Sequence, residues 1–405
     1  MFSSYISLFR QYWPMLCFGL LTVFWGNYGQ SFFISWFGAS IQQQLNLSAT
    51  AYGSAYSGAT LVSGLSILIL GGLIDRVNIR RFVLLASTGL SIAALLMWQV
   101  SGLYSLMLAF FMLRFFGQGL LPHTAVTTMA KYFSFNRGKA LSIASNGVPF
   151  GEVVLPSLAV MLIAILGWQQ VWLMVAASIP VIYVPLALWL LRRAGPSEAD
   201  LEKAPTSAAM ALDGSRRTVL TDSRFWFALP LILMPPFAVT GIFIHQGFIL
   251  TQKHWNPELF ALSFAIYGGV HWISSTVVGD LVDRFTAARL LRLMGLPFAV
   301  ALGLSGLMDG DWVALFMMAL MGVGISMMGP VIGSLWAEVY GTRHLGSIRS
   351  LVTALSVLST SVSPALLGYL IDAGMTADHL LLGLGTYGMV GSLLCFFSYR
   401  APASD

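Results

Sequence analysis

The chain has 405 residues, of which 57% are hydrophobic and only 9% are charged. Ordinary soluble domains carry about 25% charged residues, so this composition excludes a water-soluble protein and indicates one that is integral to a membrane. The net charge of +5 comes from basic residues strung singly or in pairs between apolar segments, which argues against a nucleic-acid-binding surface. The two cysteines lie in separate apolar runs, so neither a disulfide framework nor a metal site is expected.

Twelve apolar segments are long enough, at roughly 20 residues or more, to cross a bilayer as helices. In chain order the expected spans are residues 13–40, 49–73, 81–101, 103–132, 138–166, 168–191, 225–251, 258–282, 290–308, 312–339, 346–371 and 379–399. The first begins too close to the N-terminus, and runs too long, for a cleaved signal peptide. We therefore expect an all-α, multi-pass membrane protein.

The loops between these spans alternate in charge. Loops such as 71–81 and 282–289 are basic, whereas the intervening loops contain almost no Lys or Arg. By the positive-inside rule the basic loops and both chain termini are cytoplasmic, as in a protein of the bacterial inner membrane. Among the loops, Lys253 is the one basic residue on the outer side, and Arg114 is the one basic residue deep within a span.

Residues 194–222 form the one long polar stretch and are predicted to be a flexible cytoplasmic linker. Identical residues recur 208 positions apart on its two sides, as Tyr132 and Tyr340 do. Duplication of an ancestral six-span unit explains this offset. We predict two six-helix bundles, residues 1–193 and 223–405, joined by the linker.

The same offset relates two polar loops, GGLIDRVNIRR at 71–81 and GDLVDRFTAAR at 279–289. The shared positions that we single out are Gly71, Asp75, Arg76, Arg81, Gly279, Asp283 and Arg284. A carboxylate at a helix end can accept hydrogen bonds from the N–H groups that begin another helix, where the macrodipole also favours negative charge. The alternative is that the arginines act only as topology determinants.

With these loops the chain resembles the major facilitator superfamily over its whole length. The loop after the second span is similar to the family motif G-x-L-x-D-R-x-G-R-R, with Asn78 where the family usually has Gly. Asn tolerates the left-handed turn that Gly would supply. The resemblance implies two pseudo-symmetric six-helix bundles with the solute held near the midplane between them. It also implies that Asp75 and, by symmetry, Asp283 latch the cytoplasmic side shut.

Ionisable residues deep in the spans are few, and in a bilayer they mark functional positions by default. Arg114 lies in the fourth span, Glu152, the only deep acid, in the fifth, and His271 in the eighth. An unpaired Arg114 would cost about 3 kcal/mol, so we predict that Arg114 and Glu152 approach within one water of each other. The pair is either a static ion pair or one for which a substrate anion or a proton competes.

Further polar side chains extend the candidate site over spans 1, 7 and 8. They are Asn27, Gln30, His245, Tyr267 and Ser275. The two amides share one face of the first span, and large amides in lipid need partners. Tyr267 and Ser275 lie at helical spacing from His271, which favours a cavity-lining face. His245 is interpreted either as a gate residue or as a capped helix end.

Two stretches, GNYGQSFFISWFG at 26–38 and RGKALSIASNGVPFGEVVLP at 137–156, look similar to the branch that includes monocarboxylate and oxalate–formate porters. This resemblance implies a proton-linked secondary transporter of a small organic anion, with Arg114 as the anion anchor. The alternatives are a drug or metabolite efflux proton antiporter and a non-transporting membrane sensor. No nucleophile–base set and no H-E-x-x-H spacing occurs, so we expect no enzyme activity, cofactor or metal. The expected partners are the solute, protons and the lipid bilayer, with the chain acting as a monomer.

Overall fold

The computed structural model describes residues 2–70, 77–133, 136–194, 215–341 and 345–399. All regular secondary structure within these residues is helical. Ten of the described helices are long and apolar enough to cross a membrane, and they correspond to expected spans 3 to 12. Spans 1 and 2 coincide with further helices, α1 (Phe2–Gly26) with its continuation and α4 (Ala49–Leu70). Every expected span thus coincides with a helix or with a run of consecutive helices.

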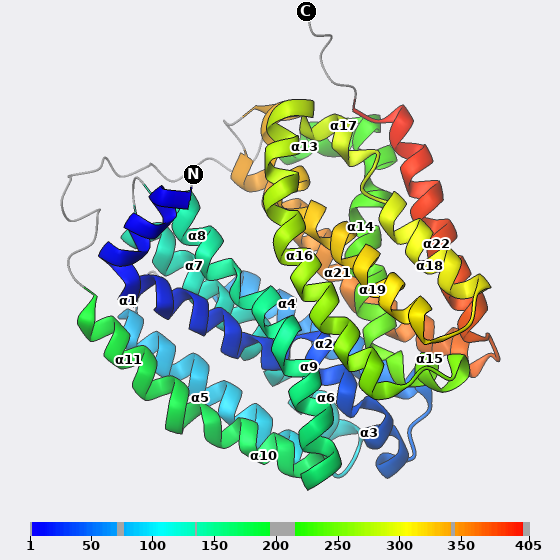
Figure 1. Cartoon of the computed structure of the whole chain (residues 1–405), viewed down its shortest axis with the longest axis horizontal. Helices are drawn as coiled ribbons and strands as arrows, with labels where there is room; N and C mark the ends of the chain where they lie inside the picture. Colours follow the sequence, from blue (N-terminus) through cyan, green and yellow to red (C-terminus); the bar gives the residue numbers. More distant parts are fainter. Residues whose placement is uncertain (1, 71–76, 134–135, 195–214, 342–344, 400–405) are drawn as a thin grey trace, which may run out of the picture. The chain divides into compact units, whose positions relative to one another are not determined.

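The N-terminal half also contains several interrupted helices, whose segments follow one another along the chain (Figure 1). Beyond α1 and α4 the segments are η1 (Asn27–Gly29), α2 (Ser31–Ile34), η2 (Ser35–Phe37), α3 (Gly38–Leu45), α5 (Ile79–Trp98), α6 (Leu103–Met112), η4 (Leu113–Leu120), α7 (Leu121–Tyr132), α8 (Arg137–Ser145), α9 (Gly147–Leu166), α10 (Trp168–Ser178), η5 (Ile179–Tyr183) and α11 (Val184–Arg193). The segments η4 and η5 are π-helical, and η1 and η2 are 3-10 turns.

The C-terminal half begins with the short helix α13 and ends with a 3-10 turn. Its segments are α13 (Ser215–Thr221), α14 (Ser223–Ile244), α15 (Gln246–Lys253), α16 (Pro257–Phe285), α17 (Ala287–Leu291), α18 (Leu296–Leu307), α19 (Asp311–Met327), η6 (Met328–Ile332), α20 (Gly333–Tyr340), α21 (Leu345–Asp372), α22 (Ala377–Leu394) and η7 (Cys395–Phe397). The π-helical segment η6 interrupts span 10, as η4 interrupts span 4, its counterpart in the first repeat.

The chain forms two compact units. The first comprises Met1–Ser40, Gly58–Gly151 and Met161–Ala208, and the second comprises Ile41–Ser57, Glu152–Val160 and Ala209–Asp405. The helices α4 and α9 therefore contribute residues to both units. The predicted bundle 1–193 contains segments 41–57 and 152–160, which the structure groups with the second unit. The division into bundles 1–193 and 223–405 stays a prediction.

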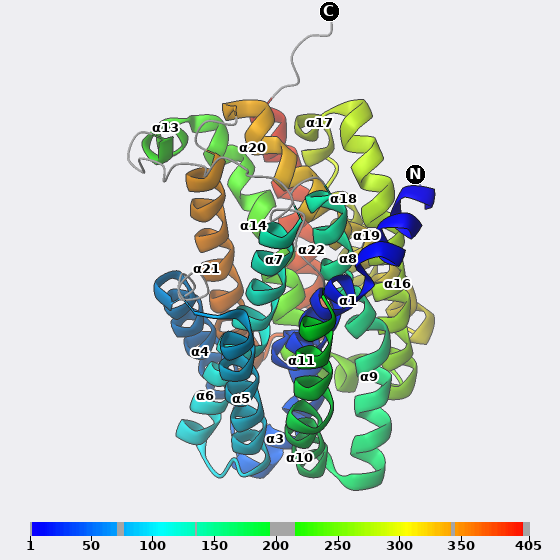
Figure 2. The same cartoon turned by 90° about the vertical axis from the view of Figure 1, so that its left-hand side faces the viewer.

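Within the first unit, α5 packs along α10, and α1 packs against α7, α8 and α11 (Figure 2). Within the second unit, α16 packs along α19, α18 along α22, and α14 along α21 (Figure 1). The α18–α22 pair is close because glycines face each other: a methyl group added to Gly385 would lie 2.7 Å from the backbone nitrogen of Gly303. Such backbone approach through small residues is how helices associate in membranes.

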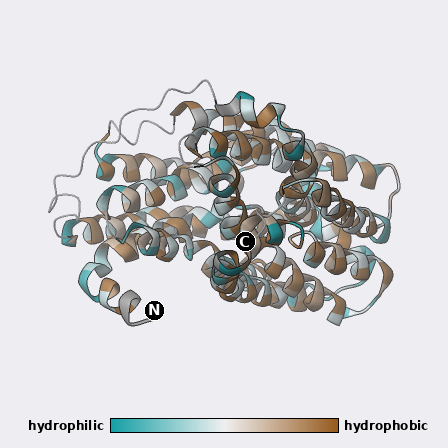
Figure 3. Cartoon of the chain, turned by 90° about the horizontal axis from the view of Figure 1, so that it is seen from above, coloured by the Kyte–Doolittle hydropathy of each residue, from teal (hydrophilic) through white to brown (hydrophobic). Residues whose placement is uncertain are grey.

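Many helical residues are hydrophobic, as the colouring of the ribbon in Figure 3 shows, and some of the large apolar side chains are exposed. Val181 is 71% exposed and Ile273 is 67% exposed. Helices that are apolar both on their packed faces and on their exposed faces suit a lipid environment, where no polar surface layer is needed.

Candidate functional site

The first predicted span is interrupted at residues 27–30. The helix α1 ends at Gly26, and η1 continues it as a 3-10 turn. Gln30 then adopts an extended conformation, with φ −83° and ψ 150°, before α2 begins at Ser31. Glycine has a low helix propensity, so the sequence G-N-Y-G favours such a break. Irregular backbone at membrane depth is tolerated where it is buried in protein or lines a cavity, which makes this break a candidate site element.

The break packs directly against the π-helical segment η4. A methyl group added to Gly29 would overlap the carbonyl oxygen of Leu113, and one added to Gly117 would lie 2.8 Å from the Cα atom of Gly29. The two backbones therefore touch without an intervening side chain. π-Helical turns inside α-helices are frequent at functional sites. Because η4 carries Arg114, the position of that guanidinium depends on the contact at Gly29.

Replacing Gly29 with alanine is expected to lower the free energy of unfolding by about 1–3 kcal/mol, because the added methyl group forces the two backbones apart. The matched control is Gly383→Ala in α22, where a methyl group meets no heavy atom within 4 Å. This control is expected to leave stability unchanged or to raise it by up to about 1 kcal/mol. Thermal unfolding of the purified variants in one detergent measures both changes, and equal effects would contradict the close contact.

Arg114 lies beside the break and is only 4% exposed. Its Nη1 atom donates a hydrogen bond to the carbonyl oxygen of Gly29 at 3.4 Å. That distance is beyond the usual range for N–H···O bonds, so the bond is weak. A guanidinium presents five N–H donors in a planar fork that matches a carboxylate. The arrangement can therefore hold an organic anion at the break.

The predicted amides lie in the break itself. Asn27 is fully buried, and its Nδ2 atom donates to the carbonyl oxygen of Gly147 at 2.7 Å. Its Oδ1 atom accepts no hydrogen bond from the part of the chain that the structure describes. Gln30 is half-buried. A methyl group on Gly151 would overlap the Asn27 amide, so the first unit holds the start of α9 against the break.

A buried carboxylate and an imidazole meet in the second unit. Glu152 Oε2 lies 2.9 Å from His271 Nδ1, with side-chain exposures of 6% and 20% respectively. The carboxylate comes from α9 in the first repeat, and the imidazole comes from α16 in the second. Such a pair can hold one proton in either of two positions, on the ring or on the carboxylate. Both residues were predicted for the site, but their direct pairing was not.

The predicted approach of Arg114 to Glu152 joins residues of different units. In the first unit Arg114 contacts the Gly29 carbonyl, and in the second unit Glu152 contacts His271. The proposed Arg114–Glu152 pair stays a prediction.

Tyr267 borders the Glu152–His271 pair. It is 1% exposed, and its ring centroid lies 6.2 Å from that of His271. Ser275 uses its hydroxyl within α16, donating to the carbonyl oxygen of Trp272 at 2.8 Å. Tyr267 therefore shapes the surroundings of the imidazole directly, whereas the Ser275 hydroxyl is engaged by its own helix.

His245 lies where α14 ends and α15 begins. It is 2% exposed, and its Nε2 atom lies 2.8 Å from the carbonyl oxygen of Pro364 in α21. The ring thus ties the junction of α14 and α15 to α21, and the choice between a gate residue and a capped helix end stays a prediction.

The polar loop motif is only partly within the described chain. Gly71, Asp75 and Arg76 lie outside the described residues, and so does the side chain of Asp283. Arg81 is exposed near the start of α5, Gly279 lies inside α16, and Arg284 is exposed in its last turn. The cytoplasmic latch stays a prediction.

Asn78 does not adopt the left-handed conformation that asparagine would tolerate at the position of the family glycine. Its φ is −57° and its ψ is 133°, and its side chain accepts a hydrogen bond from the backbone N–H of Arg80 at 2.9 Å. Asn78 is thus the N-cap of α5, a position that Asn fills better than Gly because its side-chain oxygen satisfies a free N–H group.

Sequence reasoning missed an ion-pair cluster around Lys253. Its Nζ atom lies 2.7 Å from Asp309 Oδ1 and 2.7 Å from Asp378 Oδ1, and its side chain is only 3% exposed. Burial lowers the pKa of Lys253, but the hydrogen bonds that its ammonium group donates to the two carboxylates outweigh burial and raise the pKa overall. The hydrogen bond between Lys253 and Asp309 also lowers the pKa of Asp309. The available signal was Lys253 itself, the basic residue on the outer side.

Replacing Lys253 with methionine is expected to lower the unfolding temperature most at neutral pH. The lowered pKa of Asp309 means that its contribution is present above about pH 3.9 and is lost as the pH falls through the folded value. The raised pKa of Lys253 means that its contribution is present below about pH 10.4 and is lost as the pH rises further. Unfolding temperatures of both proteins from pH 3 to pH 9 test this: a constant difference across the acid range would contradict the ion pairs.

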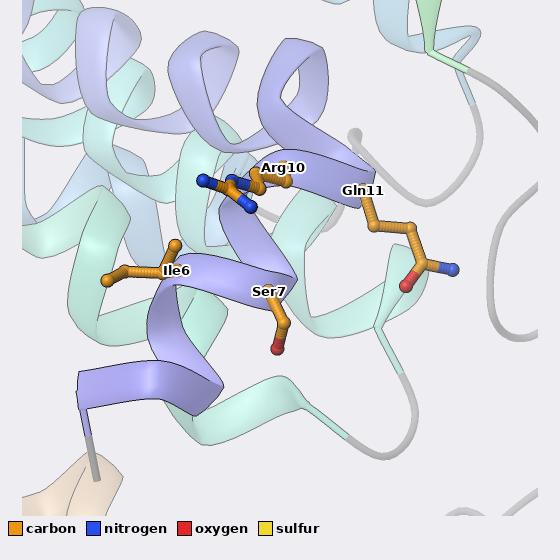
Figure 4. A pocket seen from close by; sticks show the side chains of 4 residues that line it. All are labelled: Ile6, Ser7, Arg10 and Gln11. Atoms are coloured by element: carbon orange, nitrogen blue, oxygen red, sulfur yellow. The ribbon is translucent and has the colours of Figure 1, made fainter.

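A shallow pocket lies at the N-terminal end of α1, lined by Ile6, Ser7, Arg10 and Gln11 (Figure 4). It precedes Tyr12, where the backbone leaves helical geometry with φ −122° and ψ 24°. None of the predicted site residues lines this pocket.

The chain matches the family described as Major Facilitator Superfamily over residues 16–364 and 236–405. It is 26% identical over 340 residues to the 3-(3-hydroxy-phenyl)propionate transporter of Escherichia coli (strain K12), which covers 80% of this chain and 76% of that protein. It is 23% identical over 383 residues to the uncharacterized transporter YybO of Bacillus subtilis (strain 168), which covers 85% of this chain and 84% of that protein. Both relatives are transporters and not enzymes, as predicted for this chain.

Solved structures share the fold at lower identity. A bacterial homolog of the human lysosomal transporter Spinster, inward-facing and occupied, is 16% identical with a TM-score of 0.70, covering 94% of this chain and 95% of that one. The nucleoside transporter NupG is 13% identical with a TM-score of 0.72, and the match covers 95% of this chain and 100% of that one. At these identities the likeness concerns the fold alone, and it confirms the predicted fold class.

Proposed function

Because the chain belongs to the major facilitator superfamily, whose members are membrane transporters, we propose that it moves a small organic anion together with protons. The observation that carries this proposal is the buried Glu152–His271 pair. Buried Arg114 at the broken first span supplies the second element, a cation for the anion. We propose that the site opens alternately to the two sides of the membrane, as in other two-repeat carriers.

Arg114 is the proposed anion anchor. A substrate carboxylate would offer the guanidinium two short, charge-assisted bonds, each stronger than its long bond to the Gly29 carbonyl. The irregular backbone at residues 27–30 can offer further hydrogen-bonding groups to a bound solute. The amide oxygen of Asn27 can accept a hydrogen bond from a substrate hydroxyl. Anion binding at this place depends on the guanidinium, since the described part of the break offers amides and backbone but no second cation.

The Glu152–His271 pair is the proposed proton site. With the proton on His271 the pair is an ion pair, and its charges attract strongly in a medium of low dielectric constant. With Glu152 also protonated, the attraction falls and α9 can part from α16 more easily. A proton then changes the relative free energies of two conformations, which is what coupling requires.

The solute that we propose is an organic acid, and aromatic acids are the first to test. The Escherichia coli relative is named for an acid that carries an aromatic ring and a carboxylate. Aromatic side chains are available near the break and beside the proton site: Phe24, three residues before Asn27, packs on Phe150 with ring centroids 5.5 Å apart, and Tyr267 lies beside His271. We also propose that the protein is a monomer of an inner membrane with both termini cytoplasmic.

The test is uptake into proteoliposomes that hold the purified protein under an imposed pH gradient. The panel contains arylpropionates, short monocarboxylates, nucleosides and cationic dyes. The proposal expects uphill uptake of at least one acid, abolished when the gradient is collapsed. Uptake of a dye against the proton flow would instead establish the efflux antiporter. Binding of an acid without flux would establish a sensor.

A further inference from the structure

The start of α4 is capped by a residue from the far end of the chain. The first N–H groups of a helix have no partner within the helix. The Oγ atom of Ser48 accepts from the N–H of Ala51 at 3.2 Å. The other two free groups bond one carboxylate: Ala49 N–H donates to Asp372 Oδ1 at 3.2 Å, and Thr50 N–H donates to Asp372 Oδ2 at 2.8 Å. Asp372 is the last residue of α21, 322 positions from Thr50.

The two helices stay in close contact for two turns below this cap. A methyl group on Gly53 would overlap the carbonyl oxygen of Pro364, and one on Gly368 would overlap the carbonyl oxygen of Ala49. The N–H of Ala365 donates to Ser57 Oγ at 3.0 Å. Ala49, Gly53 and Ser57 recur every four residues and so share one face of α4. Backbone contacts of this kind join spans 2 and 11 within the second unit.

The contact between α4 and α21 has features that allow the two helices to separate and rejoin. The α4 side of the contact is a strip of small residues, and the large side chain nearest to Gly53 is the ring of His245, which comes from neither α4 nor α21. The Asp372 carboxylate is exposed, so water can replace both of its hydrogen bonds when the helices part. The negative charge also lies at the positive end of the α4 macrodipole, where it favours the closed arrangement. The contact is therefore specific in position but weak enough to be broken repeatedly.

We propose that Asp372 is a latch at the predicted outer end of the molecule. Its carboxylate caps α4 and holds α4 against α21 in one phase of transport, and it releases α4 in the other. This inference rests on the alternating access in the proposed function. The class of solute and the coupling ion do not enter it.

The test uses double electron–electron resonance to measure the distance between spin labels placed near the start of α4 and near the end of α21. Spin labels at Gln44→Cys and Ala373→Cys, both exposed positions, are introduced after Cys17 and Cys395 are replaced by alanine. Asp372→Ala is expected to raise the ratio of long to short distances about fivefold, which corresponds to about 1 kcal/mol. Asp372→Asn, which keeps an acceptor but loses the charge, is expected to lie between Asp372→Ala and wild type.

The control is Glu258→Ala, which removes an exposed carboxylate from the first turn of α16 and leaves the α4–α21 contact intact. Its distance populations are expected to match those of the wild type. If Asp372→Ala lowers the unfolding temperature but leaves the distance populations unchanged, Asp372 is a structural cap and the latch is overturned. Failure of the proposed function would appear separately, as an absence of proton-linked acid uptake by the wild type in proteoliposomes.

Discussion

The variant Glu152→Gln is expected to lose proton-driven accumulation of solute by about 100-fold or more, while exchange of solute across the membrane continues. Glutamine has the shape of a protonated glutamate but stays neutral at every pH. The pair with His271 then has no carboxylate that can take up the second proton, so a pH gradient can no longer bias the conformational change through this residue. Exchange survives because it needs the binding site but no net movement of protons. Proteoliposome uptake with and without an imposed gradient, and counterflow at equal pH, measure the two activities.

The matched control is Glu258→Gln, which neutralises an exposed acid and is expected to leave both activities unchanged. If the Glu152–His271 pair is instead a static joint, Glu152→Gln lowers stability and expression together, and transport per folded molecule stays coupled. Uphill uptake by Glu152→Gln under a pH gradient would show that Glu152 does not carry the proton. His271→Gln would then be the next variant to measure.

The variant Arg114→Lys is expected to weaken binding of anionic solutes by about 10- to 100-fold, because a planar fork that makes two bonds is replaced by a point charge. Binding of neutral analogues, such as the matching amides, is expected to change little. Isothermal titration of acid and amide pairs against both proteins measures this selectivity.

The control for Arg114→Lys is Arg10→Lys, an exposed position near the start of α1. It is expected to bind the acids as the wild type does. An equal loss of affinity for acids and amides in Arg114→Lys would indicate that the side chain supports the fold of η4 and does not contact the anion.

The positions of the spans were predictable because the length of an apolar run is set by bilayer thickness and is local in sequence. The contacts between residues on different spans were not predictable in this way. Glu152 and His271 are 119 residues apart, and no local pattern states which faces of α9 and α16 meet. Charge balance and the adjacency of the two spans in sequence instead predict Arg114 as a partner of Glu152, and that pair stays a prediction.

The break in the first span had a visible sequence signal, the glycines that flank Asn27 and Tyr28, but glycine inside a span also serves helix packing. Only the contact between Gly29 and the backbone of η4 distinguishes the two uses. The cap that Asp372 provides was likewise hidden, because a carboxylate at the end of a span resembles any polar loop residue until its acceptors are placed against particular N–H groups.

The joint between Gly29 and Gly117 is made by main-chain atoms alone, and this has an evolutionary consequence. A scaffold that is fixed by its backbone constrains the size of two residues and leaves the chemical identity of their neighbours open. Asn27, Gln30 and Arg114 all lie within a few residues of that joint, but the close approach of Gly29 to Gly117 does not use their side chains. Under the proposed function, new solute preferences would therefore arise by substitution at these three positions while the two glycines stay unchanged.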